Sequence, residues 1–213
     1  MTTPPMNSLE ETLVASPVIA IIRGASSELE GTLNWLMSVG VRAVEVTTNT
    51  PQWQQAVALA INKGFAHVGV GTVVTTDHVQ QARDAGATFT VAPGLDAQVA
   101  LACSANGLIH IPGVLTPTEI QAALNMGIST LKLFPAGPLG IDYLRALRAP
   151  FNEVRFIPTG GVSVASASEW ISAGAFAVGL GGALTGSGAG SDEQTSIYLR
   201  SLTGTQTRSQ NDE

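Results

Sequence analysis

Residues 130–135 read Thr130-Leu131-Lys132-Leu133-Phe134-Pro135, a short apolar run that carries one lysine. Similar runs recur along the chain and alternate with Ala- and Gln-rich amphipathic segments. The strand candidates are residues 18–23, 43–48, 67–73, 89–94, 108–114, 130–135, 155–161 and 176–181. The helix candidates are residues 27–39, 52–63, 76–85, 96–105, 117–126, 139–147, 164–173 and 192–202. This alternation predicts an α/β protein whose parallel strands are covered by helices.

Eight such strand–helix units predict a single (β/α)8 TIM barrel with a short N-terminal helix. An open doubly wound sheet is the alternative, although it normally has fewer strands. The 213 residues, 45% of them hydrophobic, suffice for one core, so we expect one domain over residues 1–213. Residues 1–7 and 203–213 are polar and are expected to form disordered tails, and residues 186–191 a flexible loop.

The composition excludes several classes of protein. Lys and Arg number 10, form no basic cluster and leave a net charge of −6, which argues against a nucleic-acid partner. Cys103 is the single cysteine, which excludes an internal disulfide and fits a reducing compartment. The three histidines have no metal-binding spacing, and no apolar stretch or signal peptide indicates a membrane. We therefore expect a cytoplasmic protein without a metal, and the charged fraction of 12% suggests that an oligomer buries part of its surface.

The chain contains only two lysines, Lys63 and Lys132. Lys63 precedes Gly64 at what reads as a solvated helix end. Burial of Lys132 in a strand would disfavour its charged form and lower its pKa, because an ammonium loses its hydration there. A neutral lysine amine is a nucleophile toward carbonyl groups. The alternative is a lysine at a strand end whose amine reaches water.

The alternation of faces along a strand places a carboxylate near this lysine. In Val44-Glu45-Val46 the valines face the helices and Glu45 faces the interior, and Lys132 faces the interior in the same way. A buried Glu–Lys ion pair is the structural alternative, but such a pair is a poor source of stability. A lysine and a carboxylate near one carbonyl group supply the nucleophile and the proton shuttle of Schiff-base chemistry. This pattern favours a functional role for Lys132 and Glu45.

Pairs of glycines follow the last two strand candidates, Gly160-Gly161 and Gly181-Gly182. Glycine lets a backbone approach an anion closely, and the loops after strands 7 and 8 of this fold often bind phosphate. Tight turns also favour glycine, but two such pairs in consecutive late units favour a phosphate site. Gly69-Val70-Gly71 is no dinucleotide fingerprint, because neither a third glycine nor a helix start follows in register. A nicotinamide cofactor is therefore not expected.

Seven segments together resemble the 2-keto-3-deoxy-6-phosphogluconate (KDPG) / 4-hydroxy-2-oxoglutarate (KHG) aldolase family, over about residues 10–185. They are Ile21-Ile22-Arg23-Gly24, Val44-Glu45-Val46-Thr47, Gly69-Val70-Gly71-Thr72, Ala92-Pro93-Gly94, Ile111-Pro112-Gly113-Val114, Leu131-Lys132-Leu133-Phe134-Pro135-Ala136 and Pro158-Thr159-Gly160-Gly161-Val162. The resemblance implies a class I aldolase, an aldehyde-lyase with no metal and no cofactor. Its substrate would be a 2-keto-3-deoxy-6-phospho sugar acid, cleaved to pyruvate and glyceraldehyde 3-phosphate. It also implies a homotrimer.

The resemblance further implies roles for individual residues. Lys132 would form the Schiff base with the C2 ketone, and Glu45 would be the general acid and base. The substrate-binding residues would be Arg23 and Thr72 at the carboxylate, Pro93 and Phe134 along the pyruvate pocket, and Asn49 and Thr159. The phosphate would be held by Gly160, Gly161, Gly181 and Gly182.

Two departures from the family pattern concern substrate choice. Asn49 stands where gluconate-type members have arginine, and the segment 49–53 looks more like the 6-phosphogalactonate (KDPGal) branch. Thr159 instead resembles the gluconate branch, so the preference at C4 stays open, with a lean toward galactonate. Many members have serine at Gly182. Two other functions stay possible: a phosphosugar isomerase or epimerase with Glu45 as its base, and a non-catalytic protein that binds a phosphorylated metabolite.

Overall fold

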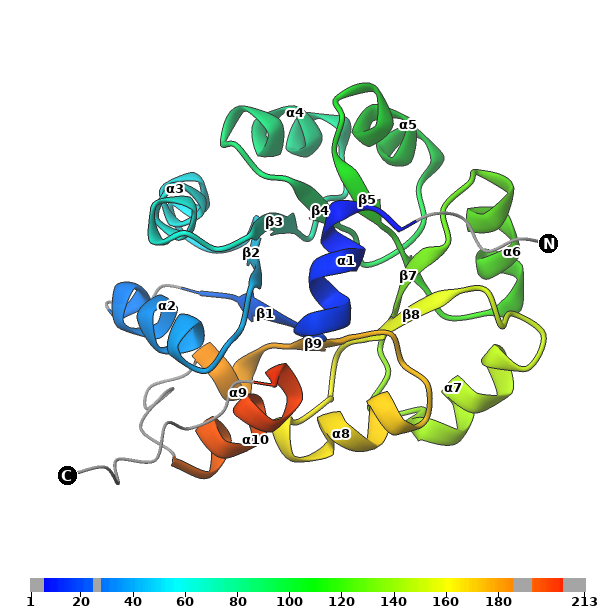
Figure 1. Ribbon diagram of the computed structural model, residues 1–213. Coiled ribbons are helices and arrows are strands. Elements are labelled where there is room, and N and C mark those ends of the chain that lie inside the picture. Colours follow the sequence, from blue (N-terminus) through cyan, green and yellow to red (C-terminus); the bar gives the residue numbers. More distant parts are fainter. Residues whose placement is uncertain (1–5, 25–27, 186–192, 205–213) are drawn as a thin grey trace.

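The computed structural model describes residues 6–24, 28–185 and 193–204. Strands gather at the centre of the molecule, and helices surround them (Figure 1). The strands are β1 (Val18–Ile22), β2 (Ala43–Thr47), β3 (His67–Gly71), β4 (Phe89–Val91), β5 (Ile109–Ile111), β6 (Gly113–Val114), β7 (Thr130–Leu133), β8 (Arg155–Pro158) and β9 (Val178–Leu180). They form a six-stranded sheet in the order β5-β4-β3-β2-β1-β9 and a three-stranded sheet in the order β6-β7-β8. All neighbouring strands in these sheets run parallel, which confirms the predicted α/β class.

Each strand candidate contains an observed strand, and one candidate is divided. Residues 108–114 form β5 and β6, separated by Pro112. Proline has no N–H group to donate to a ladder, so it interrupts regular pairing. The Pro112 carbonyl still accepts a bond of 3.0 Å from the Lys132 amide. Beyond the two sheets, an isolated parallel bridge pairs Thr159 with Gly179.

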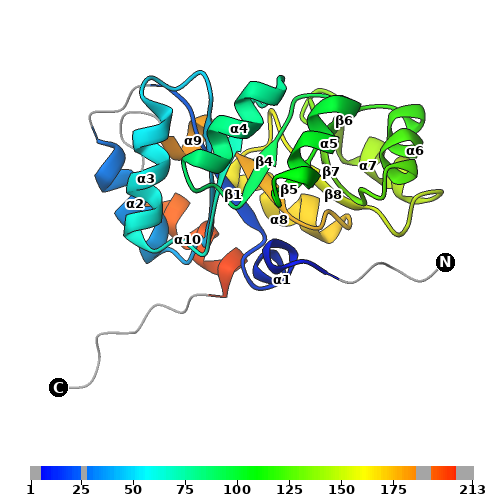
Figure 2. The ribbon, with the colours of Figure 1, turned by 90° about the horizontal axis from the view of Figure 1, so that it is seen from above.

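The predicted helices also occur, and most cover the outside of the strands (Figures 1 and 2). They are α1 (Ser8–Ala15), α2 (Leu29–Ser38), α3 (Trp53–Lys63), α4 (Thr76–Asp84), α5 (Ala97–Ala105), α6 (Pro117–Asn125), α7 (Gly140–Arg148), α8 (Val164–Ser172), α9 (Gly182–Thr185) and α10 (Glu193–Thr203). The exception in position is α1, which lies across one end of the strands. Within the described residues, no helix has the length and hydropathy needed to cross a membrane.

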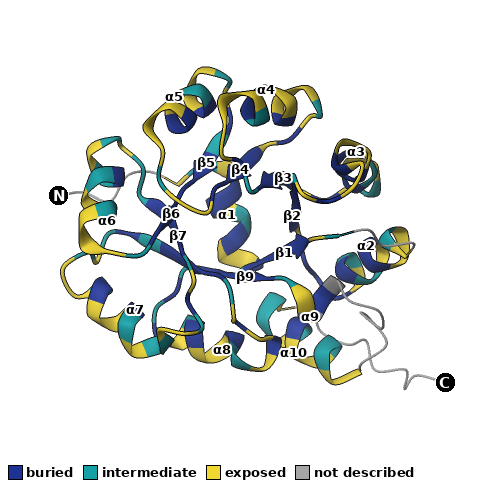
Figure 3. Ribbon diagram, turned by 180° about the vertical axis from the view of Figure 1, so that it is seen from behind, coloured by how far each residue is buried: buried dark blue, intermediate teal, exposed yellow. Residues whose placement is uncertain are grey.

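The two faces of the strands bury two separate apolar clusters. The strands are accordingly dark blue, the colour of buried residues, in Figure 3. Val44 and Val46 of β2 and Leu131 and Leu133 of β7 belong to the outer cluster, between strands and helices. Their positions confirm the alternation predicted for these strands, because residues between them must face the interior. Glu45 therefore lies on the inner face, together with the lysine of β7.

Helix α1 closes one end of the interior. Its Leu9 and Leu13 are fully buried and pack into the inner cluster with Phe89 and Ile111. The helix covers the ends at which β7 and β8 begin. Helix α1 does not cover the opposite ends of the strands, where each strand leads into its helix. Binding sites of such folds lie at those ends.

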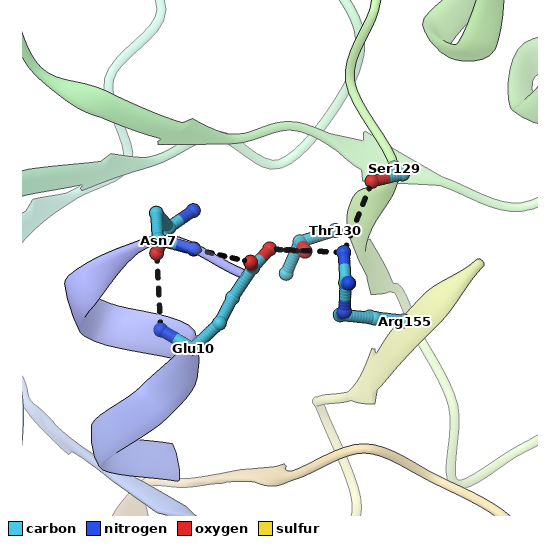
Figure 4. Close-up of polar contacts among 5 residues, drawn as sticks. All are labelled: Asn7, Glu10, Ser129, Thr130 and Arg155. Carbon is cyan, nitrogen blue, oxygen red and sulfur yellow. Dashed lines mark hydrogen bonds and ion pairs between the residues drawn. The ribbon is translucent and has the colours of Figure 1, made fainter. Parts of the chain in front are cut away.

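A buried polar cluster fastens α1 to the strands (Figure 4). The Glu10 carboxylate accepts a hydrogen bond from Thr130, the first residue of β7, and pairs with Arg155 at 3.5 Å. Arg155 also donates to Ser129 at 3.3 Å. Asn7 and Glu10 form a reciprocal capping box at the start of the helix.

Several details differ from the sequence predictions. In the sequence, Thr116-Pro117 and Thr50-Pro51 both have the pattern of a helix start, with threonine as the cap and proline as the first helical residue. Thr116 does cap α6 in a capping box, but the prediction for Thr50 is wrong. Helix α3 begins at Trp53 after Gln52, whose φ of 54° is left-handed. Asn7 and Thr203, expected in frayed tails, instead cap α1 and end α10. Residues 1–5, 205–213 and the predicted loop 186–191 lie outside the described residues.

Candidate active site

A cavity of about 510 Å³ opens at the carboxyl ends of β1, β7, β8 and β9. Its lining consists of Ile21, Arg23, Lys132, Phe134, Thr159, Gly160, Gly161, Val162, Gly179, Gly181 and Gly182. Both predicted glycine pairs, the lysine and the nearby arginine thus meet around one space. Active residues of parallel α/β barrels come from these strand ends.

A larger cavity of about 580 Å³ lies at the opposite end, between α1, α5 and the start of β7. Apolar side chains such as Leu101 and Ile128 form much of its wall, and its polar residues include the Glu10 and Arg155 pair described above. Its lining contains no lysine among the described residues. The smaller cavity is therefore the better candidate for carbonyl chemistry.

Lys132 projects from the inner face of β7 and is only 6% exposed. Its burial lowers the pKa of the amine, an effect that the nearby Glu45 carboxylate opposes and the Arg23 guanidinium reinforces. The amine lies 4.7 Å from the centre of the Phe134 ring. A lowered pKa increases the fraction of neutral amine, which is the nucleophilic form.

Glu45 projects from the inner face of β2 and is 3% exposed. Burial raises the pKa of its carboxyl group, while the positive charges of Lys132 and Arg23 act in the opposite direction. The carboxylate and the amine form no ion pair within 4.0 Å in the part of the chain that the structure describes. The two groups thus influence each other's pKa without forming an ion pair.

Gly71 of β3 makes space for this carboxylate. A Cβ atom at Gly71 would overlap the Glu45 Oε1 atom. Gly69, two residues earlier in β3, is constrained in the same way, because a Cβ atom there would overlap the Phe89 ring. The two glycines of β3 are therefore explained by packing inside the strands, where no side chain fits.

The loop after β8 presents backbone groups to the cavity. Gly160 and Gly161 both have left-handed φ values, 82° and 80°, which glycine adopts without strain. Among the described residues, the Gly161 amide donates to no other backbone group outside the helices and strands. The loop after β7 braces this turn, since the Gly137 amide donates to the Gly160 carbonyl at 2.7 Å. Successive backbone amides in a left-handed turn of this kind are suited to bind an anion.

Three predicted substrate-binding residues do not line this cavity: Asn49, Thr72 and Pro93. They follow β2, β3 and β4, which form the other half of the strand arrangement. Asn49 and Pro93 are exposed, and Thr72 is half-buried with a left-handed φ of 61°. Their roles stay predictions. Glu45 also lies outside the lining, but its charge acts on Lys132.

The prediction missed three lining residues: Ile21, Val162 and Gly179. Gly179 is the most informative of them, because a Cβ atom there would overlap the Thr159 Oγ1 atom. The small residue lets β9 approach the end of β8. Alternation in residues 177–181 could have placed Gly179 on the inner face, two residues before Gly181.

Comparison with known proteins connects this geometry to one family. The family model described as KDPG and KHG aldolase matches residues 9–197. A "2-dehydro-3-deoxy-phosphogluconate aldolase" of Treponema pallidum is 42% identical over 139 residues, which cover 64% of this chain and 66% of that protein. A "Probable 2-dehydro-3-deoxy-6-phosphogalactonate aldolase" of Rhizobium meliloti is 35% identical over 187 residues, 85% of this chain and 88% of that protein.

The fold agrees with a solved structure of the same kind. KDPG aldolase from Legionella pneumophila, with pyruvate captured as a covalent carbinolamine intermediate, superposes with a TM-score of 0.79 at 29% identity. The superposition covers 94% of this chain and 99% of that one. These relatives are named as aldolases, which are lyases, and the family resemblance of the sequence is confirmed. With its buried lysine in a cavity at the strand ends, the chain belongs to the KDPG and KHG aldolase family.

Proposed function

We propose that the protein is a class I aldolase that cleaves a 2-keto-3-deoxy-6-phospho sugar acid to pyruvate and glyceraldehyde 3-phosphate. The observation that carries this proposal is Lys132, a buried lysine of lowered pKa in the wall of the cavity. The carbinolamine captured in the Legionella relative supports the same chemistry, because a carbinolamine forms when an amine adds to a ketone.

The reaction begins when the neutral Lys132 amine adds to the C2 ketone. Loss of water from the carbinolamine gives an iminium ion, with Glu45 as the proton donor. Glu45 then removes the proton of the C4 hydroxyl, and the C3–C4 bond breaks. The electron pair of that bond moves into the iminium group, which becomes an enamine, and glyceraldehyde 3-phosphate leaves. Protonation at C3 and hydrolysis release pyruvate and restore the amine.

The substrate lies across the cavity with its two charged ends apart. The amides of Gly160 and Gly161 receive the phosphate, helped by the backbone at Gly181 and Gly182, since successive backbone amides in a turn favour an anion. Arg23 supplies a positive charge for the carboxylate end. Asn49 favours a galactonate-type sugar acid, and the name of the Rhizobium relative supports this choice.

We also propose a closed (β/α)8 barrel and a homotrimer. The bridge between Thr159 and Gly179 supports closure on one side, and only Pro112 separates β5 from β6 on the other. The low charged fraction of 12% supports assembly, because a subunit interface needs few charges.

Borohydride trapping with pyruvate, followed by peptide mass mapping, tests the function. We expect a pyruvate-sized adduct on Lys132, because borohydride reduces the imine to a stable amine. Lys132→Ala should abolish both the adduct and cleavage while circular dichroism shows the fold retained, and Lys132→Arg should do the same because arginine forms no imine.

The matched control is Lys63→Arg, since Lys63 is the other lysine and pairs with Glu30 at 2.6 Å on the surface. This variant should trap pyruvate like the wild type. Cleavage that survives Lys132→Arg would point to a base-catalysed isomerase or epimerase. A protein that forms no adduct at all would be a metabolite-binding protein, and either result would overturn the proposal.

A further inference from the structure

Three threonines at the carboxyl end of β2 bind the ends of both neighbouring strands. Thr47 is the last residue of β2, and Thr48 and Thr50 lie within the next three residues. Thr47 and Thr50 contact the end of β1, and Thr48 contacts the residue that follows β3. The contact with β1 is at Ile22, next to Arg23, and the contact after β3 is at Thr72 itself.

The contact with β1 is a buried pair of hydroxyl groups. Thr47 is fully buried and Thr50 is 5% exposed. Their Oγ1 atoms are 3.1 Å apart and lie 3.2 and 3.4 Å from the carbonyl oxygen of Ile22. One hydroxyl donates to this carbonyl, while the other donates either to it or to the first hydroxyl. The peptide fixed in this way leads directly into Arg23, which lines the cavity.

The contact with β3 holds an unusual backbone conformation. Thr72 has a left-handed φ of 61°, which a β-branched residue rarely adopts and which costs energy. The Thr48 hydroxyl donates to the Thr72 carbonyl at 3.1 Å, and the Thr48 amide donates to the Gly71 carbonyl at 2.9 Å. Gly71 is the residue that abuts the Glu45 carboxylate. Thr48 therefore fixes the segment beside that carboxylate.

We propose that Thr47, Thr48 and Thr50 are positioning residues for the site. None of the three belongs to the lining of the cavity. Their hydroxyls hold the ends of β1, β2 and β3 in one arrangement, so that the guanidinium of Arg23 and the carboxylate of Glu45 keep their places relative to the amine. This inference rests on the proposed aldolase function, because its effect is read in the kinetics of that reaction.

The test compares KM and kcat of the wild type with those of Thr→Val variants, in which a methyl group of similar size replaces one hydroxyl group. Thr47→Val should raise KM for the phosphorylated keto acid about fivefold to tenfold, the loss expected for one or two hydrogen bonds that position a binding group. Thr48→Val should instead lower kcat by a similar factor, because it loosens the segment beside Glu45. Thr47→Ser, which keeps the hydroxyl, should restore KM to within about twofold of the wild type.

Thr90→Val is the matched control. Thr90 is fully buried like Thr47, and its hydroxyl bonds to His110 at 2.9 Å on the outer side of β4. This variant should lose stability in urea unfolding without a change in KM or kcat. If Thr47→Val does not fold, Thr50→Val removes the other hydroxyl of the pair and takes its place.

The outcomes separate this inference from the proposed function. Normal KM and kcat in both valine variants, or changes no larger than in Thr90→Val, would overturn the positioning role and leave the aldolase intact. Failure of Thr47→Ser to rescue KM would also count against it. A wild type that traps no pyruvate adduct would overturn the proposed function, and this inference with it.

Discussion

At the scale of single residues, the site depends on two ionisable groups that share one buried environment. Burial lowers the pKa of the Lys132 amine and raises the pKa of the Glu45 carboxyl group, so each group is pushed toward its neutral form. Their mutual attraction opposes both shifts. In the proposed reaction, this balance lets the lysine act as the nucleophile and the carboxyl group carry a proton.

This balance predicts a pH effect of Glu45→Gln. The Glu45 charge raises the pKa of Lys132, so its removal should lower that pKa further and produce neutral amine at lower pH. The rate of Lys132 carbamylation by cyanate, followed by peptide mass mapping over a pH series, measures this directly. The matched control is Glu10→Gln, since Glu10 is 4% exposed but lies at the opposite end of the strands. An unchanged profile in Glu45→Gln would show that the two charges are not coupled.

At the scale of elements, α1 differs from the outer helices because it lies across one end of the strands and closes the interior there. It contributes two fully buried leucines to the interior and a carboxylate, Glu10, to the polar cluster below them. The cluster joins the helix to the starts of β7 and β8. The strand that carries Lys132 is thereby anchored at its first residue, Thr130, two positions before the lysine.

Loss of this anchor should destabilise the fold. Glu10→Ala removes the bond from Thr130, the pairing with Arg155 and half of the capping box, and we expect the free energy of unfolding to fall by about 3 kcal/mol. Urea unfolding measures the loss. Glu11→Ala is the control, because Glu11 is exposed on the same helix, and it should change stability by less than about 0.5 kcal/mol. Equal effects of the two variants would mean that the cluster does not hold α1.

At the scale of the whole molecule, the two sheets meet at Thr159 and Gly179. A single parallel bridge joins these two residues, and both of them line the cavity. The Thr159 hydroxyl donates to the Ile157 carbonyl at 3.2 Å and occupies the space that a side chain at position 179 would need. The contact between the two sheets and the shape of the site thus depend on the same two residues.

The contact predicts a coupled pair of mutations. Gly179→Ala should cost about 2 kcal/mol of stability, because the added methyl group meets the Thr159 hydroxyl. Thr159→Ala in the same chain should recover more than half of that loss, so the two effects are not additive. Thermal and urea unfolding of the single and double variants measure this. Gly181→Ala is the control, since its nearest neighbour would be Ile21 Cβ at 3.9 Å. A neutral Gly179→Ala would show that β8 and β9 are not adjacent in solution.

The sequence by itself determined where the strands follow one another along the chain and which face of a strand each side chain occupies. Apolar periodicity is a local property, so alternation around Val44 and Leu131 sufficed to place Glu45 and Lys132 on the inner face. The glycine pairs were also readable, because a turn that needs left-handed φ values selects glycine where it occurs. These features require no knowledge of distant contacts.

Only the tertiary structure decided which distant residues meet. Glu10 pairs with Arg155 and accepts a hydrogen bond from Thr130 at the start of β7, although nothing near residue 10 in the sequence indicates these partners. Thr50 looked like a helix cap because proline follows it, yet its hydroxyl is used by the carbonyl of Ile22, 28 residues earlier. Such contacts depend on how the strands pack around the interior. Periodicity fixes the direction of a side chain, and only packing fixes what it touches.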